Sequence, residues 1–112
     1  MEIQDERVGG TCVVTAKGRL DGQSSSVFAD RIGGLITDPN PRLLIDFAEV
    51  DFVTSAGLRA VLLLLKKVKA ANGSFALCSV RDSVRDVLEI SGFTAMLSIH
   101  PARSDAIAAL GA

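Results

Sequence analysis

The chain has no tryptophan, no tyrosine and no excess of either charge, and these absences exclude several classes of function. Its formal net charge is −1, and basic residues do not alternate with its five phenylalanines. Direct binding of nucleic acid through a basic surface that stacks on bases is therefore not expected. The 112 residues suit a single domain, residues 1–112, and the 48% of hydrophobic residues can form its core.

Cysteine, histidine and long apolar runs are also scarce. Cys12 and Cys78 are far apart, lie in apolar, strand-like segments and match no metal-ligand spacing, so two buried, reduced thiols are expected. No apolar run reaches the ~18 residues of a membrane-spanning helix. The polar, acidic N-terminus lacks the pattern of a signal peptide. We therefore expect a cytoplasmic protein without membrane insertion and without a cofactor.

Hydrophobic periodicity alternates between strand-like and helix-like segments. Strands are expected at residues 2–7, 11–17, 42–47, 75–80 and, more weakly, 95–99. Helices are expected at residues 24–36, 55–71, 82–91 and from 104 onward. The resulting order, ββαβαβα(β)α, predicts an α/β fold in which about four helices pack against a mixed sheet of four to five strands.

Turn and capping residues separate these segments. Gly9-Gly10 between the first two strands predicts a tight hairpin, since a type I′ turn needs positive φ at both central residues. The expected N-caps are one of Ser24 to Ser26 for the first helix, Asp82 or Ser83 for the third and Ser104 for the last.

One junction, Leu43 to Leu65, holds the most functional information. An apolar strand is followed by a short connector that ends in Thr54-Ser55, directly before a leucine-rich helix. A helix N-terminus offers unpaired N–H groups and a partial positive charge, so it favours a phosphate or another anion. The alternative interpretation is simple helix capping, for which Ser and Thr are preferred.

Catalytic motifs are missing around this junction. A nucleophile elbow would need Gly where Val53 stands, and the one histidine, His100, precedes Pro101 and gives Ser55 no evident base. The chain has no phosphate-binding P-loop. An acidic set, Asp21, Asp46, Glu49 and Asp51, has a mixed spacing that is more typical of surface and loop-stabilising acids than of a metal site. We therefore expect no catalytic residues, no metal and no enzyme activity, and a site that receives chemistry from another protein.

Four segments together resemble the STAS family, which includes bacterial anti-sigma factor antagonists and the cytoplasmic domains of sulfate transporters. The longest, Leu44 to Leu58, is similar to the family signature, in which a strand is followed by Ser, then Ser or Ala, and Gly-Leu. The others are Gly18 to Asp21, Phe75 to Cys78 and Val87 to Phe93. They follow in the family's order and span nearly the whole chain, so the resemblance implies a STAS-like fold.

The resemblance also implies a function in partner switching that regulates sigma-factor-dependent transcription. In the antagonist family, the serine before [Ser/Ala]-Gly-Leu is phosphorylated by an anti-sigma factor that is a GHKL-type serine kinase. That serine is Ser55 here, with Thr54 as the alternative acceptor. Phosphorylation would weaken binding to the kinase, because a charge is added where the partner docks. The expected docking residues near the phosphosite are Asp21, Asp51, Thr54, Ala56, Gly57 and Leu58.

The chain departs from the family pattern at two positions. Thr54 stands where antagonists often have Asp or Ser, and Ala48 stands where Ser is common. Two other functions stay open at this point. One is a STAS subunit of a lipid or anion transport complex that is not phosphorylated, and the other is an enzyme or a sensor of a small molecule.

Overall fold

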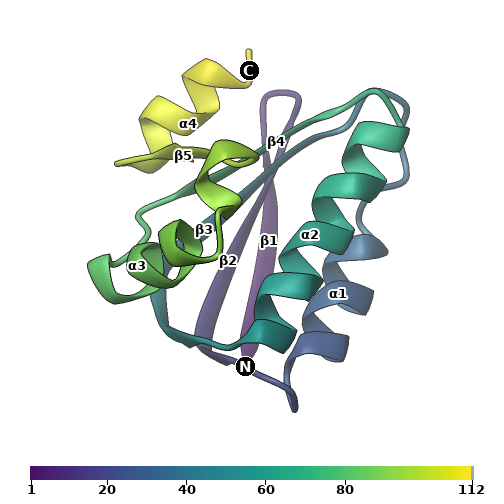
Figure 1. The fold of residues 1–112 in the computed structure, drawn as a ribbon. Coiled ribbons are helices and arrows are strands. Elements are labelled where there is room, and N and C mark those ends of the chain that lie inside the picture. Colours follow the sequence, from purple (N-terminus) through teal and green to yellow (C-terminus); the bar gives the residue numbers. More distant parts are fainter. Residues whose placement is uncertain (112) are drawn as a thin grey trace.

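The computed structural model describes residues 1–111, which form one five-stranded sheet with four α-helices around it (Figure 1). The strands, in the spatial order β1-β2-β3-β4-β5, are β1 (Glu2–Val8), β2 (Thr11–Leu20), β3 (Arg42–Val53), β4 (Ser74–Cys78) and β5 (Ser98–His100). The helices are α1 (Ser25–Gly33), α2 (Ser55–Ala70), α3 (Asp82–Ile90) and α4 (Arg103–Ala109), with a 3-10 turn at Phe93–Ala95. The predicted α/β class and the order of its elements are confirmed.

Strand β1 is antiparallel to β2, and the other neighbouring strands are parallel. The predicted hairpin between β1 and β2 is confirmed, with Val8 paired to Thr11 across Gly9-Gly10. Its type is not the predicted I′, because Gly9 has φ +60° and Gly10 is not among the residues with positive φ. One positive φ, at the first central residue, is what a type II′ turn requires.

The main departure from the sequence-based prediction is the length of β3. It was expected to end at Phe47, but it continues to Val53, and β2 extends to Leu20 beside it. The pairing of β2 with β3 is shifted twice, between Thr15 and Lys17 and between Gly18 and Arg19. These bulges place extra residues in β3, so the segment after Phe47 loses strict alternation of buried and exposed residues while it keeps its partner strand.

Two apolar clusters lie on the two faces of the sheet. The larger packs α1, α2 and α3 against one face and includes the fully buried Phe28, Phe47 and Leu64. The smaller lies under α4 and joins Val13 and Leu44 to Ala106. Figure 1 shows α1 and α2 side by side along one face, and α4 at the opposite end of the molecule from their N-termini. The start of α2 therefore lies on the face of the sheet that carries the larger core.

Several boundaries differ from the predictions for local reasons. Helix α1 ends at Gly33, and the residues expected to extend it, Leu35 and Ile36, instead form turns against the core. Strand β4 ends at Cys78 because Ser79 takes φ +57°. Strand β5 begins at Ser98, later than expected, because the 3-10 turn occupies Phe93–Ala95.

The predicted capping residues were partly wrong. Helix α3 is preceded by Arg81, so Asp82 and Ser83 lie inside its first turn. Helix α4 is preceded by Ala102, so Ser104 is also inside the helix. Ser24 is at the N-cap position of α1, but its side chain makes no capping bond to that helix. Within residues 1–111, no helix is long and apolar enough to cross a membrane.

Helix α4 is tied to the sheet by the guanidinium of Arg103. One nitrogen donates to the Asp46 carboxylate at 3.0 Å and to the Thr15 hydroxyl at 2.9 Å, and another donates to Glu6 at 2.8 Å. Asp46 is buried, and its other oxygen accepts from the Ala48 backbone N–H at 2.9 Å. Asp46 is therefore a structural acid that joins β3 to α4.

Candidate functional site

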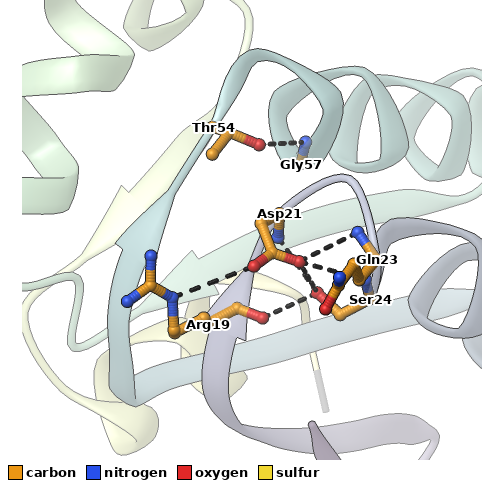
Figure 2. A network of polar contacts seen from close by, with 6 residues as sticks. All are labelled: Arg19, Asp21, Gln23, Ser24, Thr54 and Gly57. Carbon is orange, nitrogen blue, oxygen red and sulfur yellow. Dashed lines mark hydrogen bonds and ion pairs between the residues drawn. The ribbon is translucent and has the colours of Figure 1, made fainter.

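The site begins with Thr54, the N-cap residue of α2. Thr54 is extended, with φ −101° and ψ 177°, and its side-chain oxygen accepts a hydrogen bond from the Gly57 N–H at 3.4 Å (Figure 2). Its own N–H donates to the Leu20 carbonyl at 3.0 Å, which joins the start of α2 to the end of β2. The Thr54 hydroxyl therefore has a structural task, since it satisfies one of the free donors at the helix start.

Gly57 allows the first turn of α2 to lie directly on β2. A Cβ at this position would overlap the Leu20 carbonyl oxygen and would lie 2.8 Å from the Leu20 Cγ. Gly57 and Leu58 are buried and Ala56 is half-buried, so these three residues pack the helix start onto the sheet. The helix places these three residues directly after Ser55, but the burial of Gly57 and Leu58 leaves little of their surface for a partner, and their part in docking stays a prediction.

Ser55 is the first residue of α2, and its side chain is exposed. Thr54, in contrast, is half-buried and engaged in the cap. The structure thus separates two adjacent hydroxyls that the sequence alone could not rank by geometry. Ser55 offers its hydroxyl to solvent at the positive end of the helix dipole, where an added anion is tolerated.

Asp21 lies beside the start of α2, in the turn between β2 and α1 (Figure 2). Its carboxylate accepts from the backbone N–H groups of Gln23 at 3.0 Å and Ser24 at 3.2 Å. The hydrogen bond from the Ser24 N–H is the largest cause that lowers the pKa of Asp21 below its usual range, and the bond from the Gln23 N–H is the next. The Ser24 hydroxyl completes the turn by donating to the Arg19 carbonyl at 2.6 Å. These bonds therefore favour the ionised form of Asp21 at this end of the sheet, and its part in docking stays a prediction.

Asp51 is exposed in the bulged end of β3. Within residues 1–111, no hydrogen bond or ion pair joins Asp51 to Ser55 or to Asp21. Asp51 precedes Ser55 closely in the chain, whereas Asp21 comes from a distant segment that is joined to the start of α2 by the contact of its neighbour Leu20 with Thr54.

Three further residues were not singled out from the sequence. The Arg19 guanidinium lies 4.4 Å from the centroid of the Phe52 ring, and these residues are cross-strand partners. Phe52 is 44% exposed, and Val27 of α1 is 56% exposed. The exposure of Phe52 was not visible in the sequence, because it depends on the bulge that leaves both Asp51 and Phe52 exposed between the buried Val50 and Val53. The site thus has exposed apolar side chains beside its acids, which is a combination typical of protein-binding surfaces.

The remaining candidate groups lie elsewhere. Cys12 and Cys78 are buried and reduced, and burial raises the pKa of each thiol. His100 contacts the Ser98 hydroxyl at 2.8 Å, at the far edge of the sheet. No three His, Cys, Asp or Glu side chains in the described residues are grouped as metal ligands would be.

Comparisons with known proteins agree with this architecture. The model of the STAS domain family matches residues 2–106. The candidate anti-sigma factor antagonist BtrV of Bordetella bronchiseptica is 28% identical over 109 residues, which are 97% of this chain and 94% of BtrV.

Solved structures give the same result for the fold. The crystal structure of an anti-sigma factor antagonist from Mycobacterium paratuberculosis has a TM-score of 0.87 at 25% identity, and the match covers 97% of this chain and 92% of that one. A candidate antagonist from Thermotoga maritima has a TM-score of 0.90 at 19% identity, over 96% and 93% of the two chains. Since the family model spans almost all of the sequence and the sheet and helices are shared, this chain belongs to the STAS domain family.

Proposed function

We propose that this protein is an anti-sigma factor antagonist that binds its anti-sigma factor when Ser55 is unmodified. The partner is a GHKL-type serine kinase, and phosphorylation of Ser55 weakens the complex and so regulates transcription by the sigma factor. The observation that carries the proposal is the exposure of Ser55 at the first residue of α2, beside a neighbouring hydroxyl that is engaged in the cap. Similarity to BtrV over nearly the full length supports the same class.

The chemistry assigned to Ser55 is that of a phosphoryl acceptor. Its Oγ attacks the γ-phosphorus of ATP, the bond to the oxygen of the leaving ADP breaks, and the hydroxyl proton passes to a base of the kinase. This chain supplies only the positioned hydroxyl. The rigid contact between α2 and β2, through Gly57 and Leu20, holds that hydroxyl at a fixed place for the kinase.

The effect of phosphorylation follows from the charge of the surface. A phosphate adds about −1.5 to −2 charges at pH 7. The helix N-terminus tolerates this charge, so the fold is expected to persist. The docking surface around it, with Asp21 ionised and Phe52 and Val27 exposed, becomes more acidic and harder to desolvate, which disfavours a partner that fitted the neutral serine.

Phosphorylation can be tested with the cognate kinase, ATP and mass mapping of the modified residue. We expect one phosphate on Ser55 in the wild-type protein and in Thr54→Ser, and none in Ser55→Ala. Modification of Thr54, or an unmodified Ser55 beside a kinase that is active on another substrate, would contradict the proposal.

Binding provides the second arm of the test. Ser55→Ala should bind the anti-sigma factor like the wild-type protein, and Ser55→Glu should bind at least tenfold more weakly. Ser104→Glu is the matched control, because Ser104 is an exposed serine in the first turn of α4, on the other face of the sheet. Equal binding of Ser55→Glu and wild type would favour a STAS module that is not phosphoregulated, such as a subunit of a transport complex.

A further inference from the structure

Arg59 differs from the other arginines of the protein. All eight arginines lie within the described residues 1–111. Five of them form ion pairs there, and Arg42 and Arg81 donate to backbone carbonyls of Gly111 and Ala48. Among these residues, only the guanidinium of Arg59 makes neither an ion pair nor a hydrogen bond. Its charge has no structural task in this part of the chain.

The position of Arg59 relates it directly to Ser55. Both residues belong to α2 and are four positions apart, and both are exposed. Side chains at i and i+4 lie on one helical face with about 5–6 Å between their Cβ atoms. The long Arg59 side chain therefore reaches the space above the Ser55 hydroxyl without any change in the backbone.

Other charged groups around Arg59 are few. Asp30 of α1 lines the same shallow groove as Arg59, between α1 and α2, but it is not within ion-pair distance. Asp21 lies at the end of β2 and is held by its own turn. On α2 itself the nearest charge is Lys66, two turns further along the helix. A phosphate on Ser55 would thus meet Arg59 as the cation nearest to it along its helical face.

We propose that Arg59 is a positioning residue for the phosphorylated state, and that its guanidinium pairs with the phosphate on Ser55. This inference rests on the proposed function, since it describes the modified form of the same site. The pairing holds the phosphate against the first turn of α2, where the free N–H groups of the helix also favour it. Phosphorylation then changes the docking surface twice, because it adds negative charge and engages a cation that was available to a partner.

Titration of the phosphate measures this pairing without the partner. Phosphoserine is incorporated at position 55 during translation, and its second pKa is followed by ³¹P NMR at low salt. A nearby cation favours the dianion, so the second pKa should lie below the usual value of about 6. The ordinary strength of an exposed (i, i+4) ion pair predicts a pKa about 0.3 lower in the wild-type background than in Arg59→Gln.

Two variants serve as controls for this comparison. Arg85→Gln removes the same charge from α3, where Arg85 pairs with Glu89, and should leave the phosphate titration unchanged. Arg59→Lys should restore most of the difference, and 1 M salt should abolish it. Identical titration of wild type and Arg59→Gln, or an equal shift in Arg85→Gln, would overturn the pairing.

The outcome is independent of the kinase, because the phosphate is installed without it. A kinase that fails to modify Ser55 would contradict the proposed function while the titration still reports on Arg59. An unshifted titration in a protein that the kinase does modify would contradict the pairing alone.

Discussion

Replacement of Gly57 by alanine tests the packing that positions the candidate site. The added Cβ would overlap the Leu20 carbonyl oxygen and would lie 2.8 Å from Leu20 Cγ and 3.1 Å from Leu20 C. Because two of these three contacts are with backbone atoms, a side-chain rotation cannot relieve them. The first turn of α2 must then move away from β2, which also strains the 3.0 Å hydrogen bond from Thr54 N–H to the Leu20 carbonyl.

Two destabilising contributions and one stabilising contribution set the expected change in the free energy of unfolding. Overpacking costs about 1–3 kcal/mol, and a weakened hydrogen bond costs about 1 kcal/mol. Alanine in place of glycine inside a helix returns about 1 kcal/mol. Gly57→Ala should therefore lower the free energy of unfolding by about 2 kcal/mol, which lowers Tm by about 8 °C for a domain of this size.

Urea denaturation followed by far-UV circular dichroism measures this change, since the chain has no tryptophan or tyrosine as a fluorescence probe. Gly33→Ala is the matched control, because Gly33 also lies in a helix and a Cβ there would come no closer than 3.5 Å, to the flexible end of Lys67. We expect Gly33→Ala to be neutral or stabilising. The reasoning would be refuted if Gly57→Ala unfolded at the same urea concentration as the wild-type protein with an unchanged m-value.

Three further predictions concern polar groups. Thr54→Ala removes the cap of α2 and should cost about 1 kcal/mol in urea denaturation, whereas Thr54→Ser should cost little. Arg103→Met leaves the buried Asp46 carboxylate without its cation and should cost about 2 kcal/mol, most of which the double variant with Asp46→Asn should recover in thermal unfolding. The pKa of Asp21 is lower in the folded state than in the unfolded chain. The stability that Asp21 contributes should therefore be complete above its unfolded-state pKa and be lost as pH falls through its folded-state pKa. An ordinary or raised Asp21 pKa in an NMR titration would contradict the turn geometry.

Much of the fold was predictable from local patterns. The long α2 was expected at residues 55–71 and is observed at Ser55–Ala70, because its apolar periodicity and its start and stop signals are contained in one segment. The Asn72 stop is confirmed by its φ of +60°. The end of β3 was not predicted in the same way, since Glu49 and Asp51 interrupt the apolar run after Phe47 and the segment's pairing with β2 includes two register shifts.

The candidate site was also predictable only in part from the local sequence. The two hydroxyls at the start of α2 were visible as a possible cap and a possible phosphate acceptor. The family resemblance already favoured Ser55, but the physical difference between the two hydroxyls is visible only in the structure, where Thr54 is half-buried in the cap and Ser55 is exposed. The exposed Phe52 was missed for a related reason, since its outward direction depends on the bulges that shift β3 against β2.

The sequence by itself determined the order of strands and helices and the presence of Ser55 at a helix start, because periodicity and capping depend on neighbouring residues. Only the tertiary structure decided the role of groups whose partners come from distant segments. Asp46 was one of four acids with no clear partner until the sheet brought Arg103, 57 residues away, against it. Arg59 became notable only because the folded chain pairs the other arginines. Long-range contacts decide such roles, since they depend on which surfaces the fold brings together.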